Sequence, residues 1–427
     1  PSMKNLIDKI FFRNNNLKNI SERIKDLSNI KQCSKILDAI NSYSEISEIR
    51  LVGGCIRKIL NNEQVDDIDL ATNLEPNEVC EILKNNQINF FETGINHGTI
   101  TAVIDDKKFE ITSLREDLLT DGRHAHVKFS KDWRKDASRR DFTINSIYSD
   151  REGNIFDPFN GKEDLEKGIV NFIGNGEKRI KEDYLRILRY LRFFLNYSKQ
   201  KHNAETLKII RKNIEGISQL SKERLLDELK KITTPNNLIK ISKDKETLDL
   251  ISIIFPELKY IHYFSKINSQ AKSFLNEVDF LFLLSIMIID DTDNVDYFLY
   301  KYNLSNKDQN RIKIISDFYK DKPNLKSFSE KNMNKILYYQ GKQAVLDILM
   351  YNIFRLKKSN QENISNLIKL YKSKNVPLMP IKADLLMSKF NLKEGRALGN
   401  KLKLIEAKWV ENNFQISDQQ VEYIIYN

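Results

Sequence analysis

Apolar and polar positions alternate with two different periods along the chain, and the change from one period to the other divides it. Between residues 46 and 150, short strand-like segments recur: EIRLVGG, DDIDLAT, INFFETG, TITAVID and KFEITSL. In the last two, apolar and polar residues alternate on either side of Asp106-Lys107, which predicts a β-hairpin. After about residue 177 the apolar spacing becomes the three to four residues of helices, as in EDYLRILRYLRFFL.

Helices are also expected before and within the strand-rich region. Residues 1–45 have helical spacing that ends near Asn41-Ser42, a short helix follows Gly53-Gly54, and Pro76 stands where another helix begins. The most apolar segment, residues 280–289, has about half the length that a membrane crossing needs. We therefore predict an α+β protein whose small mixed head is followed by helices, with residues 280–289 as a buried core helix and with no membrane partner.

The length and composition of the chain predict its number of domains, and its charge is unevenly distributed. The chain has 427 residues, 41% hydrophobic and 30% charged, with only 14 Gly and 8 Pro, which predicts several folded domains. Its net charge of +10 comes from the last third, because residues 1–300 hold 46 basic and 47 acidic side chains whereas residues 301–427 hold 23 and 12. A basic region of this kind is typical of polyanion-binding proteins, although a solvated lysine-rich helical surface has the same composition.

Cysteine and histidine supply no metal-binding pattern. The three cysteines lack CxxC spacing, which fits a reducing compartment. His124 and His126 alternate as neighbours on a strand or loop do, but no Cys or His that could complete a zinc site lies near them in the sequence. No secretion signal is recognisable. We expect a cytoplasmic protein of bacterial origin, with a mitochondrial origin left open.

The candidate chemistry is concentrated in the head. A strand that ends at Gly53-Gly54 and enters a helix brings backbone N–H groups to a helix N-terminus, where a triphosphate can approach. Asp67 and Asp69 stand one residue apart in DDIDLAT, so their carboxylates leave the same face of a strand. Two converging carboxylates suit two Mg²⁺ ions that clamp a displacement at phosphorus. For this segment alone, a solvated acidic strand end is the simpler interpretation.

Later segments add groups that favour the phosphate chemistry. Glu110 lies on the predicted hairpin, where it can add a third carboxylate. Arg139 and Arg140 are adjacent guanidiniums suited to bidentate phosphate contacts. Asp141 and Asn145, four residues apart on an expected helix, share a face and can both hydrogen-bond a ribose.

A further cluster lies in EDYLRILRYLRF. Asp183, Arg186 and Arg189, with Arg192 beyond, repeat every three residues along one stripe of an expected helix. An ordinary charged face with intrahelical ion pairs, worth about 0.3–0.5 kcal/mol each, has the same spacing. The stripe is therefore a candidate site only together with the groups of the head.

Six of these segments occur together in the order and approximate spacing of a known family. They are LVGGCIR, DDIDLAT, GINHGT, RRDFTIN, FDPFNGKEDL and EDYLRILRYLRF. Over about residues 48–230 the chain resembles the class II tRNA nucleotidyltransferases, the CCA-adding enzymes, and most of all their alphaproteobacterial and mitochondrial branch. Toward the C-terminus only the helical texture is similar.

The resemblance implies a seahorse-like molecule with a polymerase-β-like nucleotidyltransferase head and an all-α neck, body and tail. The expected parts are an N-terminal helical extension (1–45), the catalytic head (46–150), a nucleotide-selecting neck (151–235), a helical body (236–330) and a basic tail that binds tRNA (331–427). The implied substrates are CTP, ATP and the 3′ end of tRNA, and the implied cofactor is a pair of Mg²⁺ ions. The oligomeric state is left open.

The resemblance also implies roles for the candidate residues. Asp67 and Asp69 are expected to bind the metals, with Glu110 as a further catalytic carboxylate. The residues expected to hold the triphosphate are Gly53, Gly54, Arg57, Arg139 and Arg140. Asp141 and Asn145 are expected near the ribose, and Asp183 and Arg186 at the base, with Arg189 and Arg192 nearby.

These roles make physical sense of base choice without a template. An aspartate acceptor beside an arginine donor matches cytosine and adenine, which both present an amino donor next to a ring-nitrogen acceptor, and it mispairs with uracil and guanine. Each unpaired buried group costs about 1–3 kcal/mol. In the implied reaction the tRNA 3′-hydroxyl attacks the α-phosphorus, one metal activates that hydroxyl, and the other stabilises the departing pyrophosphate.

Other functions stay open. A bacterial poly(A) polymerase shares the head, although DPFNGKEDL and the lack of an Arg-rich tail favour tRNA. Enzymes that add only cytidines are expected to lack a flexible loop between Glu110 and Arg139, where this chain keeps a long polar segment. An RNA-binding protein with an inactive head is disfavoured because Asp67 and Asp69 are both present. Lys58 departs from the family, which usually has an acid at this position.

The charge distribution gives the last expectation. If the basic third lies along tRNA phosphates, tRNA affinity falls steeply with salt. Removal of residues 301–427 then costs tRNA binding before it costs nucleotide binding.

Overall fold

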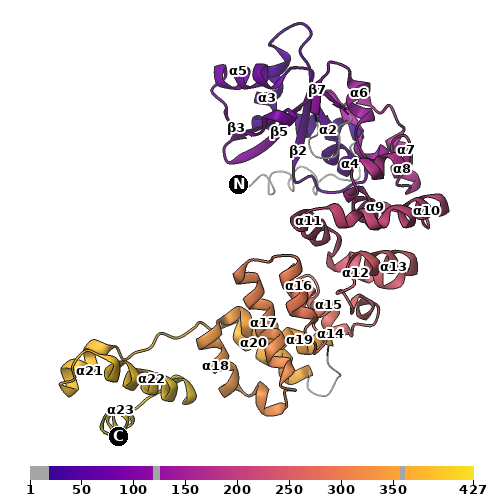
Figure 1. Ribbon diagram of the computed structural model, residues 1–427. Helices are drawn as coiled ribbons and strands as arrows, with labels where there is room; N and C mark the ends of the chain where they lie inside the picture. The colour runs from indigo at the N-terminus through magenta and orange to yellow at the C-terminus, as the bar shows by residue number, and fades with distance from the viewer. Residues whose placement is uncertain (1–18, 119–125, 356–360) are drawn as a thin grey trace. The chain divides into compact units, whose positions relative to one another are not determined.

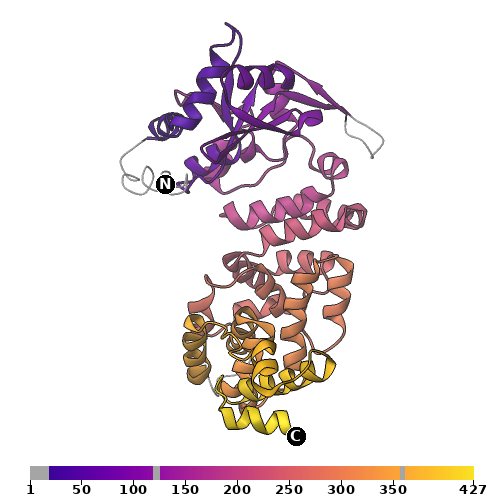
Figure 2. The ribbon, with the colours of Figure 1, turned by 90° about the vertical axis from the view of Figure 1, so that its left-hand side faces the viewer.

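The computed structural model describes residues 19–118, 126–355 and 361–427 (Figures 1 and 2). The chain divides into two compact units, residues 1–220 and residues 221–427. All strands of the described residues belong to the first unit, and the second unit is helical. The predicted order of a mixed α/β head followed by helices is therefore confirmed.

The first unit is built on a seven-stranded mixed sheet. Its strands are β1 (Ile49–Val52), β2 (Ile68–Thr72), β3 (Asn89–Gly94), β4 (Thr99–Ile104), β5 (Lys107–Ser113), β8 (Tyr148–Ser149) and β9 (Ile155–Phe156). They lie in the order β3-β4-β5-β2-β1-β8-β9, in which β2 and β5 run parallel and the other neighbours antiparallel. A separate two-stranded sheet pairs β6 (Arg115–Leu118) with β7 (His126–Phe129).

Strands β4 and β5 form the predicted hairpin, but its turn lies one residue earlier than expected. Ile104 pairs with Lys107, so the turn residues are Asp105 and Asp106, with φ of 49° and 62°. Two successive residues with positive φ are what a two-residue type I′ hairpin turn requires, and Asp tolerates this region better than most residues. Lys107 therefore belongs to the strand.

Helices cover one face of this sheet. They are α2 (Ile20–Ser28), α3 (Lys31–Asn41), α4 (Gly54–Leu60) and α5 (Pro76–Asn85), and their apolar sides share one core with the sheet. Ile68 and Leu70 of β2 and Phe109 of β5 point into this core. Because side chains alternate along a strand, Asp69 and Glu110 project from the opposite face.

Short helices complete the first unit. They are η1 (Ile95–His97), α6 (Trp133–Ser138), η2 (Thr143–Asn145), α7 (Gly161–Lys167), α8 (Gly176–Glu182), α9 (Leu185–Tyr197), α10 (Ala204–Asn213) and η3 (Ile214–Gln219). Two helix predictions are wrong here. Asn145 ends a 3₁₀ turn rather than lying on an α-helix with Asp141. Asp183 lies between α8 and α9 in an extended conformation, where its carboxylate accepts a hydrogen bond from the Leu185 N–H, so only the three arginines lie on α9.

The second unit consists of helices over its described residues. They are α11 (Lys222–Ile232), α12 (Pro235–Lys243), α13 (Lys245–Ile254), η4 (Ile261–Ser265), α14 (Ser269–Phe274), α15 (Phe280–Ile288), α16 (Asn294–Lys301), α17 (Asn306–Lys320), η5 (Leu325–Phe328), α18 (Glu330–Gln340), α19 (Lys342–Arg355), α20 (Gln361–Ser373), α21 (Ala383–Phe390), α22 (Arg396–Glu411) and α23 (Asp418–Tyr426). Residues 282–288 of α15 are buried, which confirms the predicted core helix. Across the described ranges, every helix is too short or too polar to cross a membrane.

Candidate active site

The candidate site begins at the turn between β1 and α4. Gly53 has φ of 70° and ψ of −122°, a conformation that favours glycine, and its N–H donates to the Ile147 carbonyl at 3.1 Å. A Cβ atom at Gly53 would lie 3.7 Å from the Asn145 carbonyl oxygen and 3.9 Å from Nη1 of Arg140. The turn therefore lies directly beside the segment that carries the arginine pair.

Three carboxylates, those of Asp67, Asp69 and Glu110, lie on strands β2 and β5 or directly next to them. Asp69 and Glu110 are direct neighbours in the parallel register of these strands. Asp67 comes one residue before β2, so it borders the strand rather than lying on it as predicted. Burial first, and then the charge of Glu110, raises the pKa of Asp69 to about 6. The site therefore holds more negative charge than its surroundings stabilise.

This arrangement fits Mg²⁺ bound together with a substrate. Within the described ranges, no three His, Cys, Asp or Glu side chains form a group that could hold a metal by themselves. Mg²⁺ is commonly bound by one or two carboxylates together with substrate phosphates and water, rather than by a cage of protein ligands. Asp67 and Asp69 supply such a pair, and a cation there would offset both the burial and the neighbouring negative charge that raise the pKa of Asp69.

The arginine pair follows α6 and is held by one buried acid. Nε of Arg139 lies 3.0 Å from Oδ1 of Asp136, and Nη2 of Arg140 lies 3.4 Å from Oδ2. The Arg140 backbone carbonyl also accepts a hydrogen bond from Arg179. Asp136 and Arg179 were absent from the sequence predictions, although Asp136 stands three and four residues before the pair, at helical contact spacing.

A chain of polar contacts connects α4 to α9. Arg57 donates to the Asn145 side chain, whose Nδ2 donates to Oδ1 of Asp141 at 3.1 Å. Nε and Nη2 of Arg189 approach Oδ2 of the same carboxylate at 2.7 and 2.5 Å. Burial alone would raise the pKa of Asp141, but the Arg189 guanidinium holds it below its ordinary value. Asn145 and Asp141, the two predicted ribose ligands, therefore connect Arg57 with Arg189.

The remaining predicted residues lie just before α9 and along it. Nη1 of Arg186 donates to the Arg179 carbonyl and to Oε2 of Glu182, both at 2.8 Å. Glu182 also pairs with Arg179 at 3.1 Å, so one acid holds two guanidiniums. The Arg192 guanidinium lies 4.6 Å from the ring centre of Phe193. The Arg186 N–H donates to the Asp183 carbonyl at 3.0 Å, so these two residues are adjacent, while Arg192 packs on an aromatic ring.

Other sequence predictions are placed as follows. Lys58, which departs from the family pattern, pairs with Asp66 at 3.4 Å. The tip of the polar segment between Glu110 and Arg139, residues 119–125, lies outside the described residues, and so do His124 and the side chain of His126. The zinc pair considered there is not tested.

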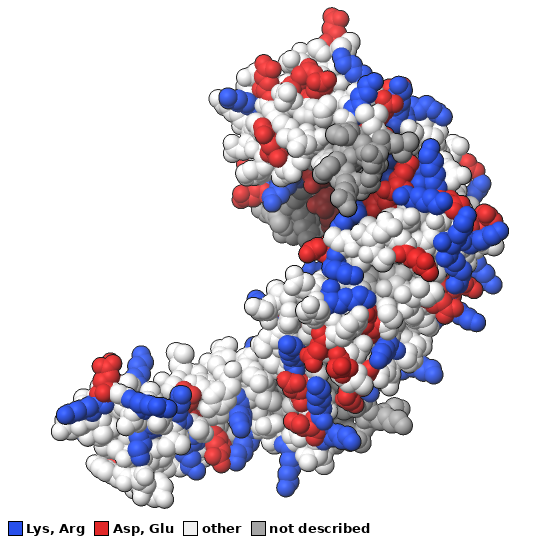
Figure 3. All heavy atoms as spheres, viewed as in Figure 1, with Lys and Arg blue, Asp and Glu red and all other residues white. Residues whose placement is uncertain are grey.

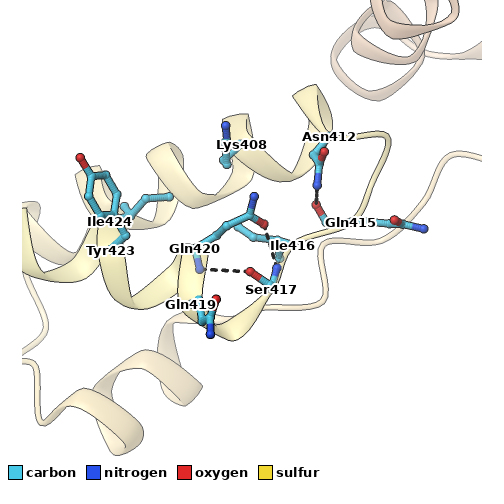
Figure 4. Close-up of a pocket in the computed structure, with 9 residues that line it drawn as sticks. All are labelled: Lys408, Asn412, Gln415, Ile416, Ser417, Gln419, Gln420, Tyr423 and Ile424. Carbon is cyan, nitrogen blue, oxygen red and sulfur yellow. Dashed lines mark hydrogen bonds between the residues drawn. The ribbon is translucent and has the colours of Figure 1, made fainter.

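A separate pocket lies on the second unit, between α22 and α23 (Figure 4). It has a volume of about 910 Å³, and its lining residues are Lys408, Asn412, Gln415, Ile416, Ser417, Gln419, Gln420, Tyr423 and Ile424. None of these residues is an acid, so the pocket offers no carboxylate ligand for a divalent cation. The carboxylate cluster of the first unit is therefore the candidate centre for phosphate chemistry.

Comparison with known families matches two segments of the chain. Residues 49–171 match the model described as "Poly A polymerase head domain". Residues 203–261 match the model described as "Probable RNA and SrmB- binding site of polymerase A". The first segment contains the strands of the site, and the second begins at α10.

Whole-chain relatives extend this similarity. The chain is 32% identical over 399 residues to the human mitochondrial CCA tRNA nucleotidyltransferase 1, which covers 89% of this chain and 87% of that protein. It is 27% identical over 418 residues to a CCA-adding enzyme of Staphylococcus aureus, covering 92% of this chain and all of that protein.

Solved structures show the same fold. The Bacillus stearothermophilus CCA-adding enzyme in complex with CTP superposes with a TM-score of 0.67 at 20% identity, covering 92% of this chain and 95% of that one. The Thermotoga maritima CCA-adding enzyme complexed with tRNA gives a TM-score of 0.62 at 20% identity, covering 96% and 98%.

Proposed function

The chain belongs to the class II CCA-adding tRNA nucleotidyltransferases, enzymes that add CCA to the 3′ end of tRNA, and we propose that it makes all three additions from CTP and ATP at the site of its first unit. Two observations carry this proposal: Asp69 and Glu110 are neighbours in the register of β2 and β5, and Nη1 of Arg140 lies beside the Gly53 turn of the same unit. Its similarity to relatives of this activity extends over 87% or more of their length.

In the proposed reaction the tRNA 3′-hydroxyl attacks the α-phosphorus of the bound nucleotide, and pyrophosphate leaves. Asp67 and Asp69 would hold two Mg²⁺ ions, which when bound supply Lewis-acid stabilisation of the attacking and leaving oxygens. Glu110, beside Asp69, adds negative charge that favours a cation in this position. No covalent enzyme intermediate is needed.

The chain's own residues would orient the nucleotide. Nη1 of Arg140 lies near the Gly53 turn, which supports a role for this guanidinium in meeting the triphosphate. Asp183 and Arg186 would meet the base. The two hydrogen bonds that Arg186 makes to Arg179 and Glu182 both use Nη1, and they fix the orientation of its guanidinium. A fixed donor beside a fixed acceptor is what base selection without a template requires.

The tRNA would be held by the basic last third of the chain. Residues 301–427 carry 23 basic and 12 acidic side chains. Figure 3 shows Lys and Arg side chains along the helices of this region, interspersed with Asp and Glu side chains. Solved relatives of the same fold include an enzyme complexed with tRNA. Contacts of this kind are electrostatic and depend on salt.

The test is a gel analysis of one tRNA that lacks its last three nucleotides, incubated with CTP alone, ATP alone and both. The proposal predicts two added nucleotides with CTP alone, and three followed by a stop with both. A long tract with ATP would identify a poly(A) polymerase. Arrest after two nucleotides with both substrates would identify an enzyme that adds only cytidines, and no extension would contradict the proposal.

A further inference from the structure

We propose that Asp136 is a positioning residue that fixes the guanidiniums of Arg139 and Arg140, so that Arg140 meets the nucleotide triphosphate. The inference rests on the proposed function, because it assumes that a triphosphate binds beside the Gly53 turn. It concerns a residue that touches no substrate and acts through its neighbours.

The carboxylate of Asp136 is almost fully enclosed, with 1% of the residue exposed. Oδ1 accepts hydrogen bonds from Nε of Arg139 at 3.0 Å and from the Arg115 backbone N–H at 3.2 Å. Oδ2 accepts from the Tyr148 hydroxyl at 2.5 Å and from Nη2 of Arg140 at 3.4 Å. Four donors from four residues therefore converge on one buried carboxylate.

The charge balance around Asp136 leaves positive charge for a ligand. Burial alone would raise the pKa of this carboxyl, but Arg140, Arg139 and the Tyr148 hydroxyl hold it below its ordinary value, so Asp136 is ionised at neutral pH. One negative charge then faces two guanidiniums, and their sum is one positive charge. A triphosphate near the pair would complete its neutralisation.

Arg139 and Arg140 face different groups around Asp136. Asp136 binds Nη2 of Arg140, and Nε of Arg140 donates to the Tyr148 hydroxyl at 3.1 Å. Nη1 of the same guanidinium lies 3.9 Å from the Cβ position at Gly53. Arg140 therefore faces the Gly53 turn, whereas Arg139 is held on the Arg115 side.

A purely structural role for Asp136 would be to stabilise α6, and the helix offers a way to test this. The N-terminus of α6 has its own cap: Oδ1 of Asp132 accepts from the Arg134 N–H at 2.9 Å and from the Lys135 N–H at 3.3 Å. Asp132 is exposed and contacts neither member of the arginine pair in these hydrogen bonds. Its removal weakens the helix and leaves the carboxylate of Asp136 in place.

The experiment measures tripolyphosphate inhibition alongside steady-state kinetics of the full-length protein. Asp136→Asn keeps the size of the side chain but replaces one acceptor oxygen with an NH₂ group that cannot accept from Arg140 or Tyr148. We expect the inhibition constant of tripolyphosphate and the KM for CTP and ATP to rise about tenfold, the size of a lost hydrogen bond to a charged group. We expect kcat to fall by less than about threefold and the tRNA Kd to stay unchanged.

Two companion variants decide between positioning and stability. Asp132→Ala should lower the Tm without changing the inhibition constant, and an equal rise in both variants would overturn the inference. Tyr148→Phe removes one donor of the same carboxylate and one contact of Arg140, and it should raise the inhibition constant by a smaller factor even if Asp136→Asn fails to fold. An unchanged constant in Tyr148→Phe or in folded Asp136→Asn would also overturn it.

The outcome is separable from that of the proposed function. If the wild-type protein extends tRNA but its tripolyphosphate affinity does not depend on Asp136, the inference fails and the function stands. If the wild-type protein extends no tRNA but binds tripolyphosphate in a way that depends on Asp136, the function fails and the inference stands.

Discussion

The candidate site of the first unit and the helix α22 near the C-terminus carry their positive charge in different ways. Around the candidate site, Arg140 and Arg189 are each held by a buried carboxylate, Asp136 or Asp141. On α22 and the segment before it, basic side chains such as Arg396 are exposed. A guanidinium held by an acid keeps one orientation and suits a ligand of fixed shape, whereas an exposed side chain can follow a phosphate backbone.

The largest effect is expected at the carboxylates of the candidate site. Asp69→Asn or Asp67→Ala should lower nucleotide incorporation at least ~1000-fold, because loss of a ligand removes the cation stabilisation on which the proposed transfer depends. The tRNA Kd should change by less than twofold. Incorporation is measured with labelled CTP, and Asp66→Asn is the matched control, since Asp66 is exposed and pairs with Lys58. Appreciable turnover in either variant would refute the metal assignment.

The second largest effect is expected on the choice of nucleotide base. Asp183→Ala or Arg186→Ala should reduce the preference for CTP and ATP over UTP and GTP by about 10- to 100-fold, because the variant no longer penalises the wrong pairing edge. The measurement is kcat/KM for each nucleotide with the same tRNA. Mg²⁺ dependence should be retained in both variants, and unchanged selectivity would contradict the assignment of these residues to the base.

A smaller and graded effect is expected in the last third. Replacement of Lys393, Arg396 and Lys403 by Gln removes three exposed charges. If all three contact phosphates, the slope of log affinity for tRNA against log salt concentration should become shallower by about 0.7–0.9 per contact. The matched control is Gln at Lys31, Lys35 and Lys84, which are exposed on helices that cover the opposite sheet face from Asp69. Equal losses in both sets would mean that only net charge matters.

The smallest effect is expected on the free energy of unfolding when an exposed ion pair is removed. Lys331 and Glu411 lie 3.2 Å apart, with side chains 61% and 56% exposed. Lys331→Gln should change the free energy of unfolding by less than about 1 kcal/mol, because solvent screens such a pair. Denaturant unfolding measures this, and a loss of several kcal/mol would show that the charges of the last third are also held in fixed positions.

The same contrast explains how much could be predicted from the sequence. Alternation along DDIDLAT and KFEIT places Asp69 and Glu110 on the face opposite the core, and the sheet pairs them as neighbours. The break at Asp183 could not be predicted from periodicity, since the apolar spacing continues through it and the break depends on a side-chain cap to Leu185. Pairing across 48 residues, as between Asp141 and Arg189, is equally invisible to a local pattern.

The role of Asp136 could not be predicted from the sequence alone. Its spacing of three and four residues from Arg139 and Arg140 is readable, but an exposed acid with the same spacing would contribute only a weak surface pair. Asp136 is important because it is buried and because Tyr148 approaches it from strand β8. The division of the chain into five parts stays a prediction, while the structure separates two units at Leu220.

The central claim is that this chain binds the nucleotide through arginines held by acids and the tRNA through exposed charge. The most direct test measures the tRNA Kd and the CTP KM of the wild-type protein between 50 and 200 mM salt, the range over which proteins that contact many phosphates lose affinity steeply. We expect a steep, linear loss of tRNA affinity on logarithmic axes and a much smaller change in the KM for CTP. Parallel slopes for both ligands would contradict it.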